Sequence, residues 1–417
     1  MKNLLFIHET SFISKIVYEY QALPELLSLK GHNVYVLDYE DKWQGLGISD
    51  YQELKVKRAY HEITLIRPFF IKFPIISRIS AFISHYFTIK RVLKDKKIDA
   101  IILYSVPTNG LQALYWAKKF KIPVIFRSID VLHKLVHNPI LSLITKQLEK
   151  HVYKQSDLIL TITPKLSEYI KKLGAKPDKI KYLALGVDTQ IYKPELPDHD
   201  LKTKWGIRNG DKVIVFVGTL PNFSGLDRFL HEMPEILREY PNTKFLIVGD
   251  GIQKYKLQNI ISALNLSNNV IITGYQPYEL VPKFINLADV CISTFPNSKT
   301  TDNILPTKVL QYLSCGKPIA STPLCGTKSV IQGFAQGIAY AQDYEFSGMI
   351  DWLFKNNDLR VRMGENALKY IKGNHDYEKI ILQLEAIIEN HADKPEAQNL
   401  VAKRLPAVRS NIHSIHT

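Results

Sequence analysis

Cysteine is scarce in this chain, and its few cysteines form no pattern. The 417 residues include three of them, Cys291, Cys315 and Cys325. Three is not the even number of a disulfide framework, and their spacing does not match that of a zinc site. We therefore expect free thiols and a reducing compartment, which indicates the cytoplasm.

Long apolar runs are also missing. No window of 18 uncharged apolar residues occurs, so no transmembrane helix is expected. The N-terminal sequence "MKNLLFIHET" has one lysine and a short apolar run, but it lacks a small-residue cleavage site. It therefore indicates a first β-strand and not a signal peptide.

Acidic residues are outnumbered by basic ones. Forty aspartates and glutamates stand against 54 lysines and arginines, which gives a formal net charge of +14. Such a surplus favours anionic partners, namely nucleic acid, an anionic membrane or phosphorylated substrates. Because no nucleic-acid-binding module is recognised, nucleic acid is not an expected partner.

Residues 55–97 concentrate positive charge and aromatic side chains. Within them, "PIISRISAFISHYFTIKRVL", residues 74–93, is apolar with sparse basic residues. This composition is typical of an interfacial surface that docks on a membrane, here through residues 67–97. A core helix with a solvated basic face fits equally well. The residues concerned are Lys55, Lys57, Arg58, Arg67, Lys72, Arg78, Lys90, Arg91, Lys94, Lys96 and Lys97, with Phe69, Phe70, Phe73, Phe82, Tyr86 and Phe87.

Apolar runs alternate with helical patterns along most of the chain. In the N-terminal half the runs are "NLLFIH", "NVYVLD", "IDAIILYS", "IPVIFRSI", "DLILTIT" and "KIKYLAL". A polar, Pro/Gly-rich segment at residues 192–211 interrupts the pattern, which resumes from "KVIVFVG" to "PIAST". Such alternation predicts α/β domains with parallel sheets that are covered on both faces.

The interruption divides the chain into two doubly wound domains. Ligands in such sheets bind beyond the carboxyl ends of the strands, at the topological switch point. The turns that face the cleft between the domains are therefore the first places to look for chemistry. We predict an N-terminal domain at residues 1–190, a linker at 191–210, a C-terminal domain at 211–375, a closing helix at 376–392 and a mobile tail at 393–417.

Three strand-to-helix turns of the second domain have glycines where a ligand would bind. Gly218 and Gly225 bracket the turn "GTLPNFSG", and the free N–H groups at the start of the next helix form an anion site. Gly249 tightens a second turn, and Gly274 allows a flat base to lie against the chain. Each is equally a routine βα turn, and Asp250 equally a helix cap.

The stretch "TDNILPTKVLQYLSCGKPIAST", residues 301–322, contains the most specific of these turns. Thr307 is a candidate helix cap, and Lys308 lies in the first helical turn. A cation there opposes the helix dipole, which costs up to about 1 kcal/mol. A diphosphate shared between the lysine and the helix terminus explains the placement. A lysine that simply extends into water explains it equally well.

These motifs carry a family resemblance. "KIKYLALGVDTQIYKP", "VIVFVGTL", "FLIVGDG", "VIITGYQPYELVPKFINLADVCIST" and "LPTKVLQYLSCGKPIAST" follow in the order and approximate spacing of GT-B glycosyltransferases. The chain resembles the retaining family four of nucleotide-sugar glycosyltransferases over nearly all of residues 1–390. The resemblance implies two Rossmann-like domains, a donor bound mainly by the second, a terminal helix that crosses back to the first, and no required metal.

Several donor-site positions depart from the family pattern. Thr219 and Ser224 stand where the family has arginine and lysine, and Asn303 and Gln311 stand where it has two glutamates. An amide still hydrogen-bonds hydroxyls but carries no charge. The resemblance implies a diphosphate clamp at Lys308 in a Pro-x-Lys motif. The full expected donor set is Gly218, Thr219, Asn222, Ser224, Gly225, Gly249, Asp250, Gly274, Tyr275, Asn303, Pro306, Thr307, Lys308 and Gln311.

The first domain supplies the expected acceptor side. Asp130, in "FRSIDVLH", resembles the acid of the family's cleft, and Asp130 or His133 would serve as the base of an inverting enzyme. Each has a plain alternative, a helix cap for Asp130 and a surface position for His133. The residues expected to contact the acceptor are His8, Glu9, Tyr104, Ser105 and Arg127.

The prediction is a hexosyltransferase, of retaining type, that moves a sugar from a nucleotide diphosphate sugar to a hydroxyl of a saccharide acceptor. The basic, aromatic segment favours a lipid-linked acceptor and a peripheral location at the inner face of the cell membrane. Two alternatives stay open. One is a nucleotide-sugar epimerase or hydrolase on the same fold, and the other is an inactive GT-B scaffold that binds saccharide or a partner glycosyltransferase.

Overall fold

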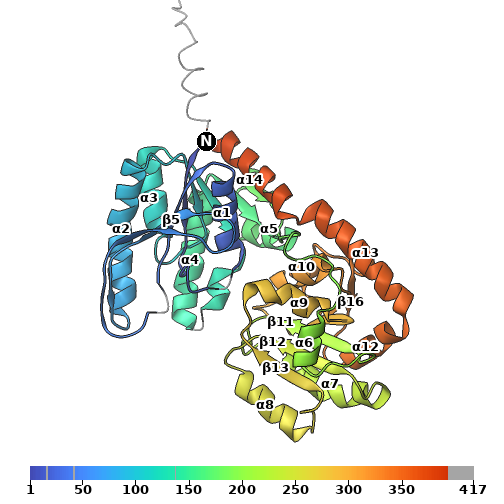
Figure 1. Ribbon diagram of the computed structural model, residues 1–417. Helices are drawn as coiled ribbons and strands as arrows, with labels where there is room; N and C mark the ends of the chain where they lie inside the picture. Colours follow the sequence, from blue (N-terminus) through green and yellow to red (C-terminus); the bar gives the residue numbers. More distant parts are fainter. Residues whose placement is uncertain (16, 41–42, 137, 393–417) are drawn as a thin grey trace, which may run out of the picture.

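The apolar runs of the first half form one eight-stranded sheet. A computed structural model describes residues 1–15, 17–40, 43–136 and 138–392 (Figure 1). The sheet has the order β10-β9-β8-β7-β1-β2-β5-β4, and every pair is parallel except β4 with β5. Its strands are β1 (Asn3–Ile7), β2 (Asn33–Leu37), β4 (Gln52–Val56), β5 (Ile63–Arg67), β7 (Ala100–Leu103), β8 (Val124–Ser128), β9 (Leu158–Thr161) and β10 (Ile180–Tyr182).

Helices cover this sheet on both faces, as the continuous apolar strands require. Helices α2, α3 and α4 pack side by side, and α1 packs against the last helix of the chain, α14 (Figure 1). The helices of this half are α1 (Glu19–Leu29), α2 (Ile76–Asp95), α3 (Gly110–Phe120), α4 (Pro139–Gln155) and α5 (Pro164–Lys172).

The second half forms a six-stranded parallel sheet with the order β13-β12-β11-β14-β15-β16. The chain leaves β11 toward β12 on one side and returns to β14 on the other, so the switch point lies between β11 and β14. The strands are β11 (Val213–Val217), β12 (Lys244–Val248), β13 (Val270–Gly274), β14 (Val290–Ser293), β15 (Ile319–Ser321) and β16 (Ile338–Tyr340). The helices are α6 (His199–Lys204), α7 (Leu226–Glu239), α8 (Lys254–Ala263), α9 (Val281–Asn286), α10 (Thr307–Ser314), α11 (Cys325–Lys328), α12 (Phe346–Lys355) and α13 (Asn357–Asn374).

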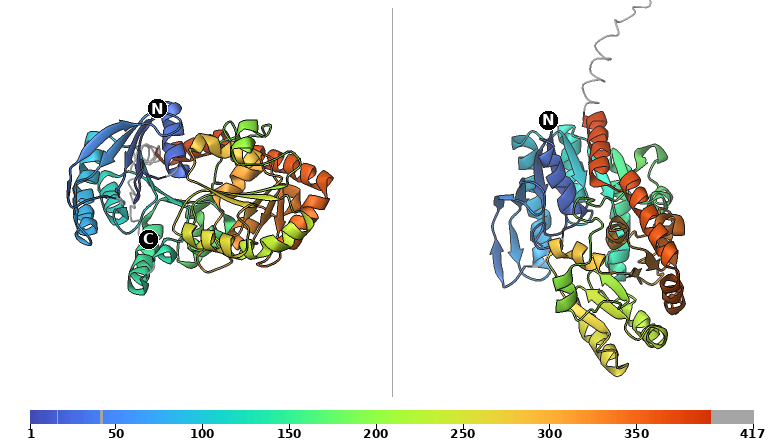
Figure 2. Two further views of the ribbon diagram at one scale, coloured as in Figure 1. Left: turned by 60° about the horizontal axis from the view of Figure 1, so that its bottom comes forward. Right: turned by 45° about the vertical axis from the view of Figure 1, so that its right-hand side comes forward.

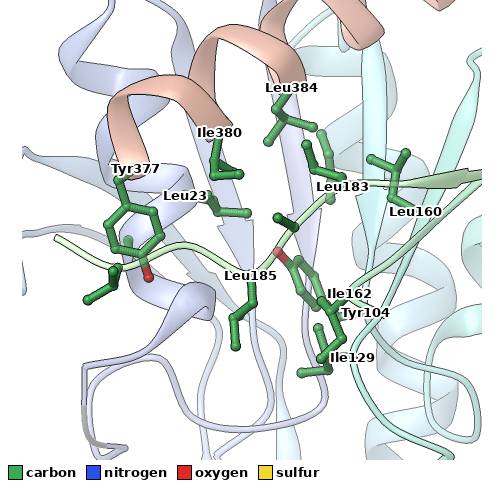
Figure 3. Close-up of a cluster of buried hydrophobic side chains, with 14 of the residues drawn as sticks. Leu23, Tyr104, Ile129, Leu160, Ile162, Leu183, Leu185, Tyr377, Ile380 and Leu384 are labelled. Carbon is green, nitrogen blue, oxygen red and sulfur yellow. The ribbon is translucent and has the colours of Figure 1, made fainter. Parts of the chain in front are cut away.

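Helix α14 (Tyr377–Ala392) returns to the first domain (Figure 2). The buried side of α14 includes Tyr377, Ile380 and Leu384. These side chains pack on Leu23 and Leu185 of the first domain (Figure 3). The crossing is further fixed by polar contacts. The imidazole of His375 is 2.7 Å from the carbonyl oxygen of Leu185, and His32 pairs with Glu385 at 3.0 Å. The two domains are therefore tied by a packed helix as well as by the linker.

Some local structure differs from the expectation. Residues 47–72 were expected to contain no strands, but they form a small antiparallel pair, β3 (Gly47–Ser49) with β6 (Phe70–Lys72), the antiparallel strand β4 and the buried parallel strand β5. The exposed, polar residues of β4 give no apolar run to predict it from. Helix α1 begins at Glu19 because Tyr18 is its N-cap, with its N–H donating to Gln21. The expected tail at 393–417 lies outside the described residues.

The exposed surface of the first domain is rich in apolar side chains. On α2 the side chains of Ile79, Phe82, Ile83 and Phe87 are exposed, while the opposite side of the helix is buried. None of the described helices has a stretch apolar and long enough to span a bilayer. The exposed side of α2 therefore carries apolar as well as basic side chains, while its other side packs on the core.

Candidate active site

Lys308 is the centre of the candidate site. It is the second residue of α10, which begins at Thr307 after the extended Pro306. Thr307 is thus the first helical residue and not the cap that we expected. The side chain is 8% exposed, and its Nζ lies 3.5 Å from the ring centroid of Phe216 and 4.6 Å from that of Phe295. Two aromatic faces on β11 and just after β14 therefore hold the amine at the switch point.

Gly218 leaves the space that this lysine occupies. A Cβ atom added at Gly218 would lie 3.1 Å from Nζ of Lys308, and the backbone φ of +135° disfavours any other residue. Gly249 packs as closely, since a Cβ there would lie 1.9 Å from the carbonyl oxygen of Gly218. The two glycine turns thus stack and bring the backbone close to the amine.

The amine of Lys308 has no acceptor among the described residues. Burial lowers the pKa of this amine well below its ordinary value. An isolated buried ammonium is strongly unfavourable unless it is paired. A phosphate oxygen at this place would supply the missing partner, so the site is chemically suited to an anion.

The turn before α7 packs closely against the backbone that follows β14. Gly225 is the N-cap of α7 with φ +72°, and a Cβ there would lie 1.8 Å from the carbonyl oxygen of Thr294. The Ser224 hydroxyl donates to Gln253 at 3.2 Å and is fully buried. Its placement therefore argues against a donor contact through this side chain. Thr219 and Asn222 are exposed on the same turn.

The next two turns offer polar groups at the surface. Asp250 pairs with Lys254 at 2.8 Å, while Gln253 is the N-cap of α8, so Asp250 does not cap that helix. Gly274, with φ +71°, bridges to Gly249, and Tyr275 is 67% exposed. Gly274 thus joins the stacked glycine turns, while Asp250 and Tyr275 flank them at the surface.

Asn303 and Gln311 are both half-buried around the start of α10. Neither side-chain amide is hydrogen-bonded within the part of the chain that the structure describes. The loop that carries Asn303 is fixed through its backbone, because Gly326 donates to the Asp302 carbonyl at 2.7 Å. Both amides therefore keep their donors and acceptors for a ligand.

Tyr18 joins the two domains at this point. Thr307, next to Lys308, lies close enough to the Tyr18 phenol to lower its pKa, against the larger effect of burial, which raises it. The carboxylate of Asp130 lies close enough to raise the pKa of Tyr18 and Tyr20 electrostatically. Asp130 and Thr307 therefore both lie near Tyr18.

Asp130 is half-buried at the end of β8. Burial raises the pKa of its carboxyl to about 7. Helix α4 is capped by Asn138, so Asp130 is not a helix cap. A carboxyl with that pKa exchanges a proton near neutrality, which is what acid–base chemistry at the acceptor hydroxyl requires.

The side chain of His133 is held in one orientation by its neighbours, so it is not the free surface histidine of the alternative interpretation. It lies in a 3₁₀ turn (Leu132–Leu135), and its Nδ1 is 2.5 Å from Oε2 of the fully buried Glu149. The ring stacks on Tyr169 at a centroid distance of 6.2 Å. Burial raises the pKa of Glu149. The neighbouring Lys134 interacts electrostatically with Asp302, so this turn faces the second domain.

The residues at the end of β1 are more enclosed than expected. His8 is buried between Tyr20 and Tyr104, with ring centroids 5.1 and 5.0 Å away, and its ring nitrogens have no partner among the described residues. Burial lowers the pKa of His8 to about 3, so it is neutral. Glu9 accepts from the Thr108 backbone at 2.7 Å and pairs with Arg78 at 3.3 Å.

Arg127 does not face a ligand. It is fully buried and pairs bidentately with Glu19, with Nε and Nη2 at 2.8 and 2.6 Å from the two carboxylate oxygens. Nη1 donates to the Leu183 carbonyl at 2.7 Å. Tyr104 donates to the same Glu19 at 3.2 Å. The placement of both residues argues against the expected acceptor contact and assigns them to the support of α1.

Ser105 is likewise engaged, since its hydroxyl bonds to Asn109. Sequence reasoning missed Tyr18 and Tyr20, which lie near Asp130, and Glu149, which orients His133. These three residues could not be predicted from local sequence, because each acts through a partner more than 15 positions away. A tyrosine just before a helix gives no hint that it reaches the other domain.

Two family models match the chain. The model described as "Glycosyltransferase Family 4" matches residues 21–191. The model described as "Glycosyl transferases group 1" matches residues 198–370. Together they cover both domains and leave the closing helix outside.

The most similar relatives are glycosyltransferases. Alpha-D-kanosaminyltransferase from Streptomyces kanamyceticus is 23% identical over 54% of this chain and 58% of that protein. Alpha-monoglucosyldiacylglycerol synthase from Acholeplasma laidlawii is 24% identical over 85% of this chain and 88% of that protein. The chain thus spans less than two thirds of the first relative and most of the second.

Solved structures agree on the fold. HepE from Anabaena in complex with UDP aligns with a TM-score of 0.71 at 14% identity, over 93% of this chain and 100% of that chain. Sucrose-phosphate synthase from Thermosynechococcus elongatus aligns with a TM-score of 0.75. The expected arrangement of two Rossmann-like domains is confirmed. The chain has the GT-B fold, and its two domains resemble glycosyltransferase family 4 and group 1.

Proposed function

We propose that this protein transfers a sugar from a nucleotide diphosphate sugar to a hydroxyl of a saccharide or lipid-linked acceptor. The observation that carries the proposal is the unpaired, buried amine of Lys308 at the switch point of the second sheet. The structure of HepE, which has the same fold, holds UDP. A nucleoside diphosphate suits this site, because its phosphates would pair with the amine and its base would lie against the glycine turns.

In this proposal the second domain stabilises the leaving group. As the bond from the sugar to the diphosphate breaks, negative charge grows on the β-phosphate. Lys308 and the free N–H groups at the start of α10 point at that charge, and such fixed donors contribute several kcal/mol. Asn303 and Gln311 hydrogen-bond hydroxyls of the sugar and ribose in place of the family's glutamates.

The first domain in this proposal positions the acceptor. Asp130, with its pKa of about 7, hydrogen-bonds the acceptor hydroxyl opposite Lys308. The family resemblance favours retention of the anomeric configuration. The configuration of the product's new bond, read from its anomeric proton coupling by NMR, decides between retention and inversion.

The proposed location is the cytoplasmic face of a membrane. Helix α2 exposes Ile79, Phe82, Ile83 and Phe87 beside a row of basic residues, a combination that suits an anionic bilayer. The synthase from Acholeplasma laidlawii is named for a diacylglycerol product. Charge reversal at Lys90, Arg91 and Lys94 should release the protein from anionic vesicles, and unchanged sedimentation with them would contradict this location.

Thermal shift with a panel of nucleotide sugars tests the donor, with Lys308→Ala as the matched variant. Stabilisation of the wild type by at least one nucleotide sugar, reduced in the variant, is expected.

Nucleotide release that depends on added acceptor supports a transferase. Release or isomerisation without acceptor supports the epimerase or hydrolase alternative, and saccharide binding without donor binding supports the inactive scaffold. Turnover should survive a chelator, because the proposal requires no metal.

A further inference from the structure

The first turns of α4 form a second apolar projection on the first domain, separate from α2. We call residues 139–144 the α4 tip. Ile140, Leu141, Leu143 and Ile144 are 70, 54, 61 and 50% exposed. The first fully packed residue of the helix is Thr145, and the buried side continues through Glu149 and Val152. Four adjacent large apolar side chains in water are unusual on a monomer and mark an interaction surface.

The α4 tip is a defined helical end. Asn138 accepts from the backbone N–H groups of Ile140 and Leu141 at 3.0 and 3.1 Å, which caps the helix. At 100° per residue, the four apolar side chains spread over about 160° of the helix surface. Between them Ser142 turns inward and donates to the His133 carbonyl at 2.7 Å. The α4 tip is therefore held to the turn that follows Asp130.

The charge around the α4 tip identifies what covers it. Lys134, Lys146 and Lys150 flank it, and no aspartate or glutamate occurs between Lys134 and Leu148. A second copy of this chain would bring the same positive surface, and its net charge of +14 opposes self-association. An anionic bilayer accepts both the apolar side chains and the flanking lysines.

The α4 tip and the start of α2 lie at the same edge of the first sheet. The tip follows the carboxyl end of β8, and Arg78 of α2 donates to Thr108, which follows β7, at 2.8 Å. The strands β7 and β8 are parallel neighbours, so both projections lie at their carboxyl edge. In Figure 1 both helices reach the lower end of the first domain. Asp130 lies at this edge too.

We propose that the α4 tip inserts into the interface of an anionic bilayer and, with α2, holds the acceptor side of the cleft at the membrane surface. This inference rests on the proposed transferase function, because it explains how a membrane-bound hydroxyl would reach Asp130. It adds a second apolar anchor to the apolar and basic side chains that α2 exposes. Contact through two separated elements fixes the orientation of the first domain on the membrane, whereas contact through one helix would not.

Co-sedimentation of the full chain with phosphatidylglycerol vesicles tests the proposal. The variant Ile140→Asp with Leu143→Asp should bind at least about tenfold more weakly. The matched control places aspartates at Leu196 and Leu382, apolar residues that are 92 and 57% exposed and lie outside α2 and α4. It should bind within about twofold of the wild type. Equal binding by the α4 tip variant and the wild type would overturn the proposal.

A second measurement separates insertion from contact between proteins. Brominated lipid in the same vesicles should quench more tryptophan fluorescence in Ile144→Trp than in the wild type, which has four native tryptophans, whereas Leu382→Trp should show no added quenching. If the α4 tip variant instead changes the oligomeric state and leaves vesicle binding intact, the surface joins two copies and the proposal fails. Stabilisation by nucleotide sugars is measured without vesicles. Loss of that signal contradicts the proposed function, while loss of vesicle binding alone contradicts only the membrane inference.

Discussion

The Nζ atom of Lys308 lies 3.5 Å from the centroid of the Phe216 ring. The ring belongs to β11 and the amine to α10, so this contact joins two elements that flank the switch point. An aromatic face attracts a cation but supplies no counter-charge. The lysine is thus held in place without a counter-charge, and an anionic ligand would stabilise its protonated form.

Lys308→Met should stabilise the protein in the absence of ligand. The substitution removes a buried amine that lacks a partner and keeps the aliphatic packing, so we expect a gain of about 1–3 kcal/mol at pH 7. Calorimetric unfolding measures it. Lys317→Met is the control, because the buried Lys317 donates to the Asn286 carbonyl at 2.9 Å. That variant should lose stability, and a loss in both would contradict our account of Lys308.

The gain from Lys308→Met should shrink as the pH rises. The folded-state pKa of Lys308 is lowered below its unfolded value. Between those two values the unfolded chain binds more protons, so wild-type stability increases with pH there. The methionine variant lacks this dependence. Unfolding free energies of both proteins at pH 7 and pH 10 check it, and a constant difference would count against a perturbed lysine.

Asp130→Asn should gain stability relative to the wild type as the pH rises from 4 to 8. The folded-state pKa of Asp130 is about 7, above its unfolded value, so the folded protein holds the proton more tightly. Wild-type stability therefore falls through this window, and the asparagine variant does not share that loss. Denaturant unfolding at several pH values measures the difference. Activity of the wild type should also change near pH 7, and the variant should lack that change.

Arg127→Met should destabilise the first domain by about 3–5 kcal/mol, because it leaves the buried Glu19 unpaired. Adding Glu19→Leu should recover most of the loss, since the double variant has no isolated charge. Urea unfolding followed by circular dichroism gives the free energies for this cycle. Additive losses would show that the two side chains act independently.

The architecture was predictable because it depends on local patterns. The buried strands such as Leu4–Ile7 and Val213–Val217 are continuous apolar runs, which only a sheet covered on both faces explains. The polar strand β4 (Gln52–Val56) has no such run, since it lies at the edge and pairs with β5 alone. Its existence follows from the neighbouring strand and not from its own composition.

The site was predictable only in part. The position of Lys308 followed from its place in a turn and from the family motif. Its aromatic surroundings did not, because Phe216 and Phe295 are ordinary residues of strand ends. Arg127 looked available because a lone arginine near the end of a strand carries no sign of its partner. That partner, Glu19, lies 108 positions away, so only the folded chain brings the pair together.

Calorimetric titration with UDP, on the wild type and on Lys308→Met, tests the central claim most directly. The claim is that the unpaired amine at the switch point binds the diphosphate of the donor. We predict saturable binding by the wild type and at least about tenfold weaker binding by the variant, which loses one charge-assisted contact. If wild type and variant bind UDP equally, or if the wild type binds no nucleoside diphosphate, the claim is wrong.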